Sequence, residues 1–286
     1  MSFRWGRTLR QRVAPFVPER IKAPLRPRLF GYRPPDVALP VEFSSDDLGR
    51  LVVIDRRVTL RYRDEDASDF QYHLADNGES IEEIASFIGL AGSARTFFDV
   101  GAWKGLFSLI FCLLDAGKRA VAYEPSSSGI HAMSALGDLN GCASRIVLRP
   151  VGVGVASGRA SAHIDPSGIV TVAAGAASGH AIDDLEIVSL DDEVRSSGVA
   201  PDLLKIDVEG YEYEVLVGAR VLLRERKPAI CLELHLDLLE RRGQSPIDVL
   251  GELQSHGYQF RSCAGDDLSA SQICNSMYAV RRFVAI

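Results

Sequence analysis

Charged residues alternate with apolar residues near the ends of two strand-like segments. Lys205, Asp207 and Glu209 occupy every second position of LLKIDVEG, and Glu233 and His235 do so at the end of PAICLELH. Side chains two residues apart in a β-strand point to the same face of the sheet. Because an unpaired buried charge costs several kcal/mol, we expect these side chains to face one polar cleft. The alternative is a structural ion-pair network, for example between Lys205 and Glu233, that only positions the following helix.

A second group of informative residues lies in DVGAWKG and in the strand-like segment that follows it. Asp99 begins a turn that contains Gly101 and Gly105, and a helical run of apolar residues comes next. Glu124 lies near the end of RAVAYEP, 19 positions after Gly105, and Pro125 follows it. A strand, a glycine turn, a helix and a strand that ends in an acid are typical of nucleoside binding, since one carboxylate can accept both ribose hydroxyls.

The charge beside this turn indicates which nucleoside it suits. The turn lacks the third glycine of the dinucleotide motif GxGxxG and carries Asp99 directly before it. Negative charge at that point repels phosphate and favours a cationic ligand. S-adenosylmethionine meets this requirement, because it has an α-amino group and a sulfonium but no phosphate. The alternatives from other classes are a nicotinamide-dependent oxidoreductase and a non-catalytic nucleoside-binding module.

The order of the predicted elements indicates a doubly wound α/β fold. From Thr96 onward, apolar strand-like segments alternate with helices predicted over 105–114, 126–139, 211–223 and 247–256. Helices between five apolar strands imply right-handed crossovers and a parallel sheet, and the last two strands are expected to form an antiparallel edge. Ligands of such sheets bind beyond the carboxyl ends of the strands, where both groups of residues lie.

Composition divides the chain into three predicted parts. Residues 1–40 form a basic Pro- and Arg-rich arm, residues 41–78 a hairpin and linker, and residues 79–286 the ligand-binding domain. The first 33 residues carry nine basic residues and one acid, with aromatic residues between them. The composition of this arm favours a solvated tail, and peripheral contact with an anionic membrane or partner is the alternative. Acceptor specificity is expected in the arm, the hairpin and an irregular insertion over 156–179.

Chain length, net charge and cysteine content argue against several classes of protein. The chain has 286 residues and a formal net charge of −6, so a nucleic acid is not expected as its partner. Five cysteines without a CxxC spacing indicate reduced thiols. We find neither a signal peptide nor an apolar run of about 18 to 20 residues. These observations predict a cytoplasmic protein, with contact to the inner membrane through the arm as an addition.

Several segments together resemble the FkbM-type S-adenosylmethionine-dependent methyltransferases. The string KIDVEGYEYEVLVGA is highly specific to that family, whereas DVGAxxG is shared with many methyltransferases. The resemblance covers about Ser80 to Val284. The sequence departs from the pattern at Trp103, where the turn usually carries a smaller polar residue. The matching stretches are FFDVGAWKG, AYEPS, Asn140, the run Leu190 to Asp192, LLKIDVEGYEYEVLVGA and PAICLELH.

The resemblance implies a class I methyltransferase, Rossmann-like fold with a seven-stranded sheet, to which this chain adds its N-terminal extension. It implies methyl transfer from S-adenosylmethionine to a hydroxyl of a sugar, a glycan or glycolipid, or a polyketide-like natural product. It also implies that Asp99, Gly101, Gly105 and Glu124 belong to the cofactor site. To these we add Ala102, Trp103, Pro125 and Asn140.

Transfer to a hydroxyl assigns roles to the charged strand ends. His235 is the first candidate for the base that takes the hydroxyl proton, and Asp207 is the second. Lys205 would orient the acids, and Glu209 would bind a substrate hydroxyl or the cofactor's amino group. No metal is favoured; the alternative is a magnesium or manganese ion held by Asp207, Glu233 and His235.

Overall fold

A computed structural model describes residues 39–47, 49–164, 170–172, 180–275 and 280–286, without the side chains of residues 164, 170–172 and 180–183. Nearly all of the predicted basic arm therefore lies outside the described residues, and the division into three parts stays a prediction. No helix in the described ranges is both long enough and apolar enough to cross a membrane.

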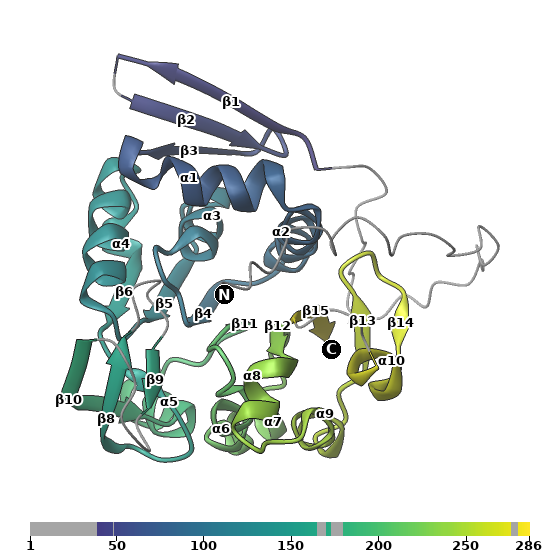
Figure 1. Ribbon diagram of the computed structural model, residues 1–286. Coiled ribbons are helices and arrows are strands. Elements are labelled where there is room, and N and C mark those ends of the chain that lie inside the picture. Colours follow the sequence, from purple (N-terminus) through teal and green to yellow (C-terminus); the bar gives the residue numbers. More distant parts are fainter. Residues whose placement is uncertain (1–38, 48, 165–169, 173–179, 276–279) are drawn as a thin grey trace, which may run out of the picture. The chain divides into compact units, whose positions relative to one another are not determined.

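A sheet of eight strands, in the order β14-β13-β15-β12-β11-β4-β5-β6, forms the centre of the fold (Figure 1). The five strands from β12 to β6 are parallel to one another, which confirms the predicted α/β class. They are β12 (Ala229–His235), β11 (Leu203–Ile206), β4 (Thr96–Val100), β5 (Arg119–Tyr123) and β6 (Ile146–Arg149).

The other three strands make the antiparallel part of the sheet larger than expected. β15 (Val280–Ala285) pairs with β12 and with β13 (Phe260–Ser262), and β13 pairs with β14 (Asp267–Leu268). The predicted count of seven strands is one short because the turn after Ser262 returns as a two-residue strand, which is too short to show a period in the sequence. β14, at the edge, is antiparallel to its only neighbour in this sheet.

Alternate residues of the central strands pack against helices on opposite faces. In β4, Phe97 contacts the ring of Phe87, whereas its neighbour Phe98 contacts the ring of Tyr123. Figure 1 shows α2 and α3 on one side of the sheet and α6 to α9 on the other. The helix bounds are α2 (Gly78–Ala91), α3 (Leu106–Leu114), α4 (Ser127–Leu139), α5 (Leu190–Ser197), α6 (Glu212–Val217), α7 (Arg220–Glu225), α8 (Leu236–Arg241), α9 (Pro246–Ser255) and α10 (Ala270–Cys274), with η3 (Ala143–Arg145) as a 3₁₀ turn.

Short polar side chains set where several of these helices begin. The Asn77 side chain accepts from the amides of Glu79 and Ser80 and so caps α2. Ser126, Ser189 and Ser245 do the same for α4, α5 and α9. Such caps bond amides that have no partner inside the helix.

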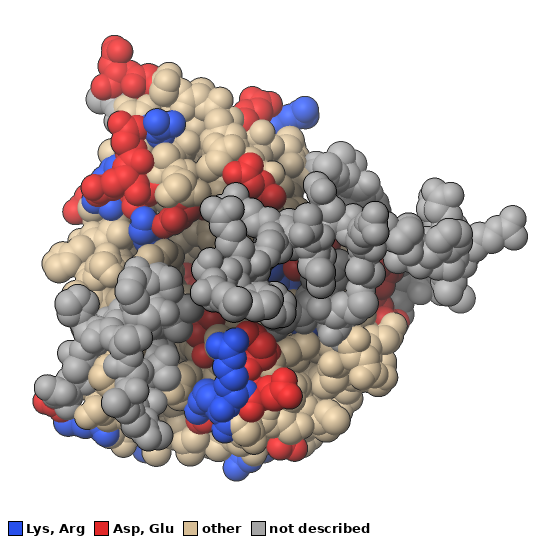
Figure 2. Space-filling view, viewed as in Figure 1, with Lys and Arg blue, Asp and Glu red and all other residues tan. Residues whose placement is uncertain are grey.

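A separate three-stranded sheet precedes the central fold. β1 (Val41–Asp46), β2 (Gly49–Ile54) and β3 (Val58–Tyr62) pair in sequence order, which confirms the predicted hairpin and adds a strand to it. β3 contacts α3 and α4. Acidic and basic side chains lie side by side over this sheet in Figure 2. Arg61 and Asp46 form an ion pair between β3 and β1. Three short helical turns lead on to α2: η1 (Asp64–Asp66), α1 (Ala67–Gln71) and the π-helical η2 (Tyr72–Asp76).

The predicted irregular insertion belongs to a four-stranded sheet in the order β7-β10-β8-β9. The bounds are β7 (Gly152–Val153), β8 (Gly158–Ile164), β9 (Val170–Val172) and β10 (His180–Val188). β8 pairs antiparallel with both β9 and β10. Residues 165–169 and 173–179 of the insertion lie outside the described ranges.

The helix predicted over 211–223 is two helices, α6 and α7, broken at Gly218. A Cβ atom on Gly218 would lie 2.0 Å from the carbonyl oxygen of Gly154, so the insertion packs directly on this backbone. The Gly218 carbonyl accepts from the amide of Asp191, and the Asp191 carboxylate accepts from the amides of Val221 and Leu222. These contacts with α5 separate α7 from α6, which the apolar period alone does not reveal.

Asp191→Ala should lower the free energy of unfolding by about 1 to 2 kcal/mol, because it removes the side-chain cap of α7. Urea denaturation followed by circular dichroism measures this change. Glu225→Ala is the control, since Glu225 is exposed and its ion pair among the described residues is with its neighbour Arg224. We expect that control to stay within about 0.5 kcal/mol of the parent protein. Equal stability of the two variants would contradict the capping role.

Candidate functional site

A cavity of about 460 Å³ lies beyond the carboxyl ends of β4, β5, β11 and β12. Its volume is within the range of small-molecule sites, roughly 300 to 1,000 Å³. This main pocket is where a doubly wound sheet is expected to bind its ligand. Its wall includes the predicted residues Gly101, Trp103, Glu124, Pro125, Asp207, Glu209, Glu233 and His235.

The turn after β4 uses its own amides for internal hydrogen bonds. The amides of Gly101 and Ala102 both donate to the Tyr123 carbonyl, over 3.0 and 3.1 Å. The amide of Trp103 donates to Glu124 Oε2 over 2.8 Å. A pyrophosphate would need such amides to be free, so these three are not available to bind one.

The two glycines of this turn are required for packing. Gly101 has a φ of +81°, and a Cβ there would lie 1.7 Å from the carbonyl oxygen of Asp207. Gly105 has a φ of +78°, and its Cβ would lie 2.4 Å from Cγ of Met133. Gly101 lines the main pocket, whereas Gly105 does not. Trp103 also has a positive φ, of +48°, and lines the pocket.

Glu124 is held rigidly at the end of β5. It is 5% exposed, Oε2 accepts from Trp103 as described, and Oε1 accepts from the amide of Ser126 over 2.8 Å. Burial raises the pKa of Glu124, and the bonds from Ser126 and Trp103 oppose that rise. Each oxygen keeps a further lone pair for a ligand hydroxyl.

Besides Gly105, three further predicted cofactor residues lie away from the main pocket. Asp99 is buried under the turn and accepts from the amide and the hydroxyl of Ser108, over 3.1 and 2.7 Å; burial raises its pKa to about 6. Asp99 and Ala102 line a smaller neighbouring cavity. The Asn140 side chain is bonded instead to the backbone of Arg61, on β3. Asn140 therefore joins α4 to the first sheet.

Lys205 lies under the pocket as a buried cation surrounded by acids. Its Nζ is 3.1 Å from Glu83 and 3.2 Å from Asp207. Glu233 lies 3.6 Å from the same atom, and the ring centroid of Phe107 lies 4.6 Å away. Burial opposes the charge, but the three carboxylates outweigh it and raise the pKa of Lys205 well above its usual value. The ion-pair network considered from the sequence therefore exists, with Glu83 as an additional member.

The surroundings shift the pKa values of Asp207 and Glu233 in opposite directions. For Asp207, the charges of Lys205 and His235 outweigh burial and lower its pKa. For Glu233, burial and the charge of Asp207 raise the pKa. Arg282 of β15 donates to Glu233 and also pairs with Glu83, so a second cation lies at this end of the network.

His235 is held by acids at both ring nitrogens. Nδ1 lies 2.8 Å from Glu212, which is fully buried, and Nε2 lies 3.2 Å from Glu209 and 3.8 Å from Asp207. Burial disfavours the imidazolium, but the hydrogen bond to Glu212 and the charges of Asp207 and Glu209 raise the pKa of His235 to about 9. His235 is therefore protonated at neutral pH.

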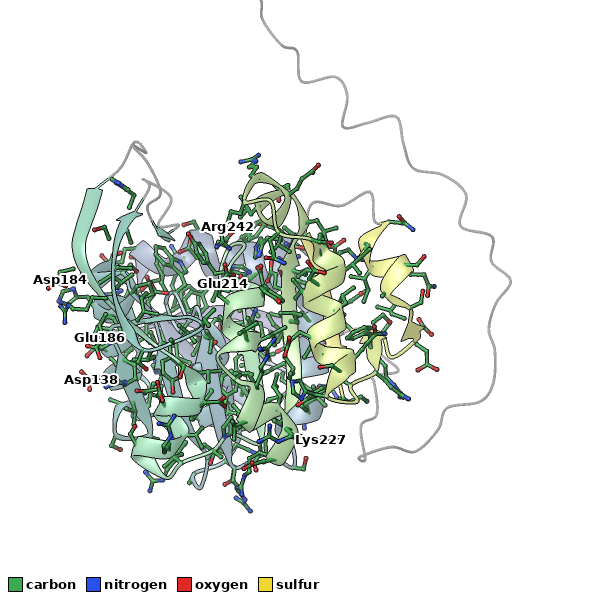
Figure 3. The ribbon with its side chains drawn as sticks, turned by 90° about the horizontal axis from the view of Figure 1, so that it is seen from below. Asp138, Asp184, Glu186, Glu214, Lys227 and Arg242 are labelled. Carbon is green, nitrogen blue, oxygen red and sulfur yellow. The ribbon has the colours of Figure 1, made fainter. Side chains whose placement is uncertain are left out.

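Arg242 fixes the loop that carries Glu209 and Gly210, whose φ values are +52° and +92°. Its guanidinium lies 3.5 Å from the ring centroid of Tyr211 and donates to the Gly210 carbonyl. It also pairs with Glu214, and Figure 3 shows these two side chains close together. The loop is thereby fixed from its outer side while Glu209 and Tyr211 line the pocket.

The candidate metal ligands do not fit a divalent cation. Asp207, Glu233 and His235 offer ligand atoms within 4.8 Å of one another. However, Lys205 and Arg282 already neutralise the two carboxylates, and both nitrogens of His235 face acids. A dication here would lie beside two fixed cations and would require His235 to lose its proton.

Several pocket residues were not predicted from the sequence. Tyr72 and His73 come from η2, Tyr211 from the loop before α6, and Arg282 from β15. Histidines other than His235 were expected in surface or packing roles. Of these residues, only Arg282 had a signal in the sequence that pointed to the pocket. Antiparallel pairing of β15 with β12 places it opposite Glu233.

Comparisons with known proteins identify the family of the chain. The family model described as Methyltransferase FkbM domain matches residues 99–260. A search of curated proteins found no match. The crystal structure of Methyltransferase FkbM from Methylobacillus flagellatus KT is similar, with 20% sequence identity and a TM-score of 0.43, over 67% of this chain and 43% of that one. An O-methyltransferase from Bacillus cereus in complex with SAH has 11% identity and a TM-score of 0.40, over 77% and 84% of the two chains.

The stability contributed by His235 should depend on pH. Its pKa is raised on folding, so this contribution is complete below the unfolded pKa of about 6.5 and is lost as pH rises through about 9. The difference in free energy of unfolding between the parent protein and His235→Gln should fall by about 3 kcal/mol over that interval.

Urea denaturation at pH 6, 7.5 and 9.5 measures this difference. His131→Gln is the control, because His131 is exposed on α4. Its difference from the parent protein should not change with pH. A His235→Gln difference that is constant or increases with pH would show that His235 is neutral in the folded protein.

Proposed function

The chain belongs to the FkbM methyltransferase family, and we propose that it transfers a methyl group from S-adenosylmethionine to a hydroxyl oxygen of a sugar, a glycan or glycolipid, or a polyketide-like product. The observation that carries this proposal is the closed turn after β4 beside an acid-rich pocket. Its first three amides are bonded internally, which disfavours a pyrophosphate, and the acids favour a cationic methyl donor.

Glu124 supports a ribose at the end of β5. Its two oxygens are fixed by backbone amides, and each keeps a lone pair that can accept from a ligand hydroxyl. Val151, Val153 and Ile187 form an apolar part of the same wall. A nucleoside with its ribose on Glu124 and its base on the apolar part uses both features.

The charged half of the pocket supports the sulfonium and the acceptor. Asp207, Glu209 and Glu233 face it with His235 and Arg282, and a carboxylate about 4 Å from a cation contributes about 1 to 4 kcal/mol in a partly wet site. Transfer cancels the positive charge on sulfur, so most of the rate acceleration must come from holding the oxygen in line with the methyl group at about 3 Å.

Polar and aromatic side chains in the same half support a polyhydroxylated acceptor. Tyr72 and Tyr211 present aromatic rings, and Glu209, Glu233 and Arg282 present hydrogen-bonding groups. Rings cover the apolar faces of a sugar, and carboxylates accept from its hydroxyls. Protonated His235 donates to the neighbouring acids and stabilises their charges. We therefore propose that the role of His235 is to orient Glu209.

Calorimetry should show that the protein binds S-adenosylmethionine and S-adenosylhomocysteine but not NAD. Glu124→Ala should weaken S-adenosylhomocysteine binding by about 1 to 3 kcal/mol, because a polar contact of the ligand loses its partner. Asp138→Ala is the control, since Asp138 is exposed on α4 and lies at the periphery in Figure 3. Tight NAD binding without adenosylmethionine binding would favour an oxidoreductase. Parent affinity in Glu124→Ala would place the ribose elsewhere.

Methyl transfer distinguishes an enzyme from a binding module. The full-length protein, incubated with methyl-labelled S-adenosylmethionine and a fraction of glycans and glycolipids, should place label in an ether that survives mild alkaline hydrolysis. Label in a base-labile ester would indicate a carboxyl acceptor. Cofactor binding without transfer to any fraction would favour the binding module.

A further inference from the structure

Two cavities meet at the turn after β4. Behind the main pocket lies a cavity of about 70 Å³, whose wall includes Asp69, Lys104 and Lys205. At about 30 Å³ per water molecule, this rear cavity has room for about two. Four residues line both cavities: His73, Gly101, Trp103 and Asp207.

His73 is held at this boundary by its own π-helical turn. The ring of Tyr72 meets the imidazole edge-on, with centroids 5.2 Å apart. Tyr72 is fixed in turn by Asn77, whose Nδ2 lies 3.0 Å from its hydroxyl. π-Helical turns are rare and occur often at functional sites. The backbone of η2 therefore presents this imidazole to the pocket.

Charges of both signs face the imidazole. They are Lys205 of β11, Asp207 directly after it, Glu83 of α2 and Arg282 of β15, and Asp69 and Lys104 share the rear cavity with it. Burial is the largest effect and lowers the pKa of His73. Among the described residues, none hydrogen-bonds to its ring nitrogens. Within the described part of the chain, an imidazole whose pKa is lowered by burial and whose nitrogens have no bonding partner thus borders the pocket.

The other titratable groups of the pocket are less suited to accept a proton. His235 already carries one at neutral pH. Asp207 is a weak base, because Lys205 and His235 lower its pKa. Glu209 lies against the His235 ring, and Glu233 is bonded to Arg282. Among these residues, His73 combines a free acceptor nitrogen with a route away from the pocket.

We propose that His73 is the general base that accepts the proton of the acceptor hydroxyl and releases it through the rear cavity. This inference rests on the proposed function. The hydroxyl oxygen forms a bond to the methyl carbon while the carbon–sulfur bond breaks, and its electron pair stays on sulfur. The O–H proton moves to the free nitrogen of His73. The products are the methyl ether, S-adenosylhomocysteine and one proton, which leaves by way of water beside Asp69.

Nuclear magnetic resonance of the histidine rings tests where His73 lies relative to the methyl donor. His73→Gln identifies its signal by loss. The pKa of His73 should lie below 6.5 and should be lower with S-adenosylmethionine bound than with S-adenosylhomocysteine. One unit charge at ~5 Å in a high dielectric accounts for about half a pKa unit. Equal values in the two complexes, or a pKa above 7, would overturn the proposal.

The pH dependence of methyl transfer separates His73 from His235. The probe is the glycan and glycolipid fraction used above. With His73 as the base, kcat/KM should rise with pH only up to the pKa of His73 and be level from about pH 7. With His235 as the base, it would continue to rise to about pH 9.

Variants complete the test. His73→Gln should lower kcat by roughly 10²-fold or more and should remove the rise of kcat/KM with pH below about pH 7. Its binding of S-adenosylhomocysteine should be unchanged. His131→Gln should match the parent protein. An active His73→Gln with the parent pH profile refutes this inference alone, whereas a parent protein that binds no adenosylmethionine or transfers no label refutes the proposed function.

Discussion

Lys205 carries a positive charge into the sheet, and the acids around the pocket depend on it. Asp207 just beyond the end of the same strand, Glu233 from the next strand and Glu83 from α2 converge on its ammonium group. Any of these acids would be unstable inside the protein without a cation. The network therefore joins a helix and two strands and leaves a surplus of carboxylates facing the pocket. That surplus gives the site its preference for a positively charged ligand.

Much of the fold and part of the site could be predicted from local patterns. The period of two in LLKIDVEG and PAICLELH correctly brought Asp207 and His235 to one pocket, because strand geometry fixes the direction of side chains. Glu124 was found in the same way, from an acid at a strand end. Parallel strands place their carboxyl ends at one edge, so the prediction required no knowledge of tertiary contacts.

Residues from distant elements could not be predicted in this way. Arg282 meets Glu233 only through the register of β15 on β12, and His73 enters from a π-helical turn that has no clear sequence signal. Asn140 is the opposite case, because it was predicted as a site residue and lies away from the main pocket. Its position after α4 resembled a cofactor contact, yet its amide bonds the backbone of β3. In each case, long-range packing decided the role of the side chain.

The contact between Gly154 and Gly218 ties the insertion to the helical layer. The two backbones approach so closely that Gly218 cannot gain a side chain without moving Gly154, whose carbonyl oxygen would lie 2.0 Å from the added Cβ. The amide of Gly154 also bonds the carbonyl of Val188, where β10 ends. Exchanging the segment from β8 to β10 between homologous enzymes to alter acceptor choice should therefore succeed best with junctions placed between Gly154 and Val188. The grafted segment would then leave both backbone contacts of Gly154 intact.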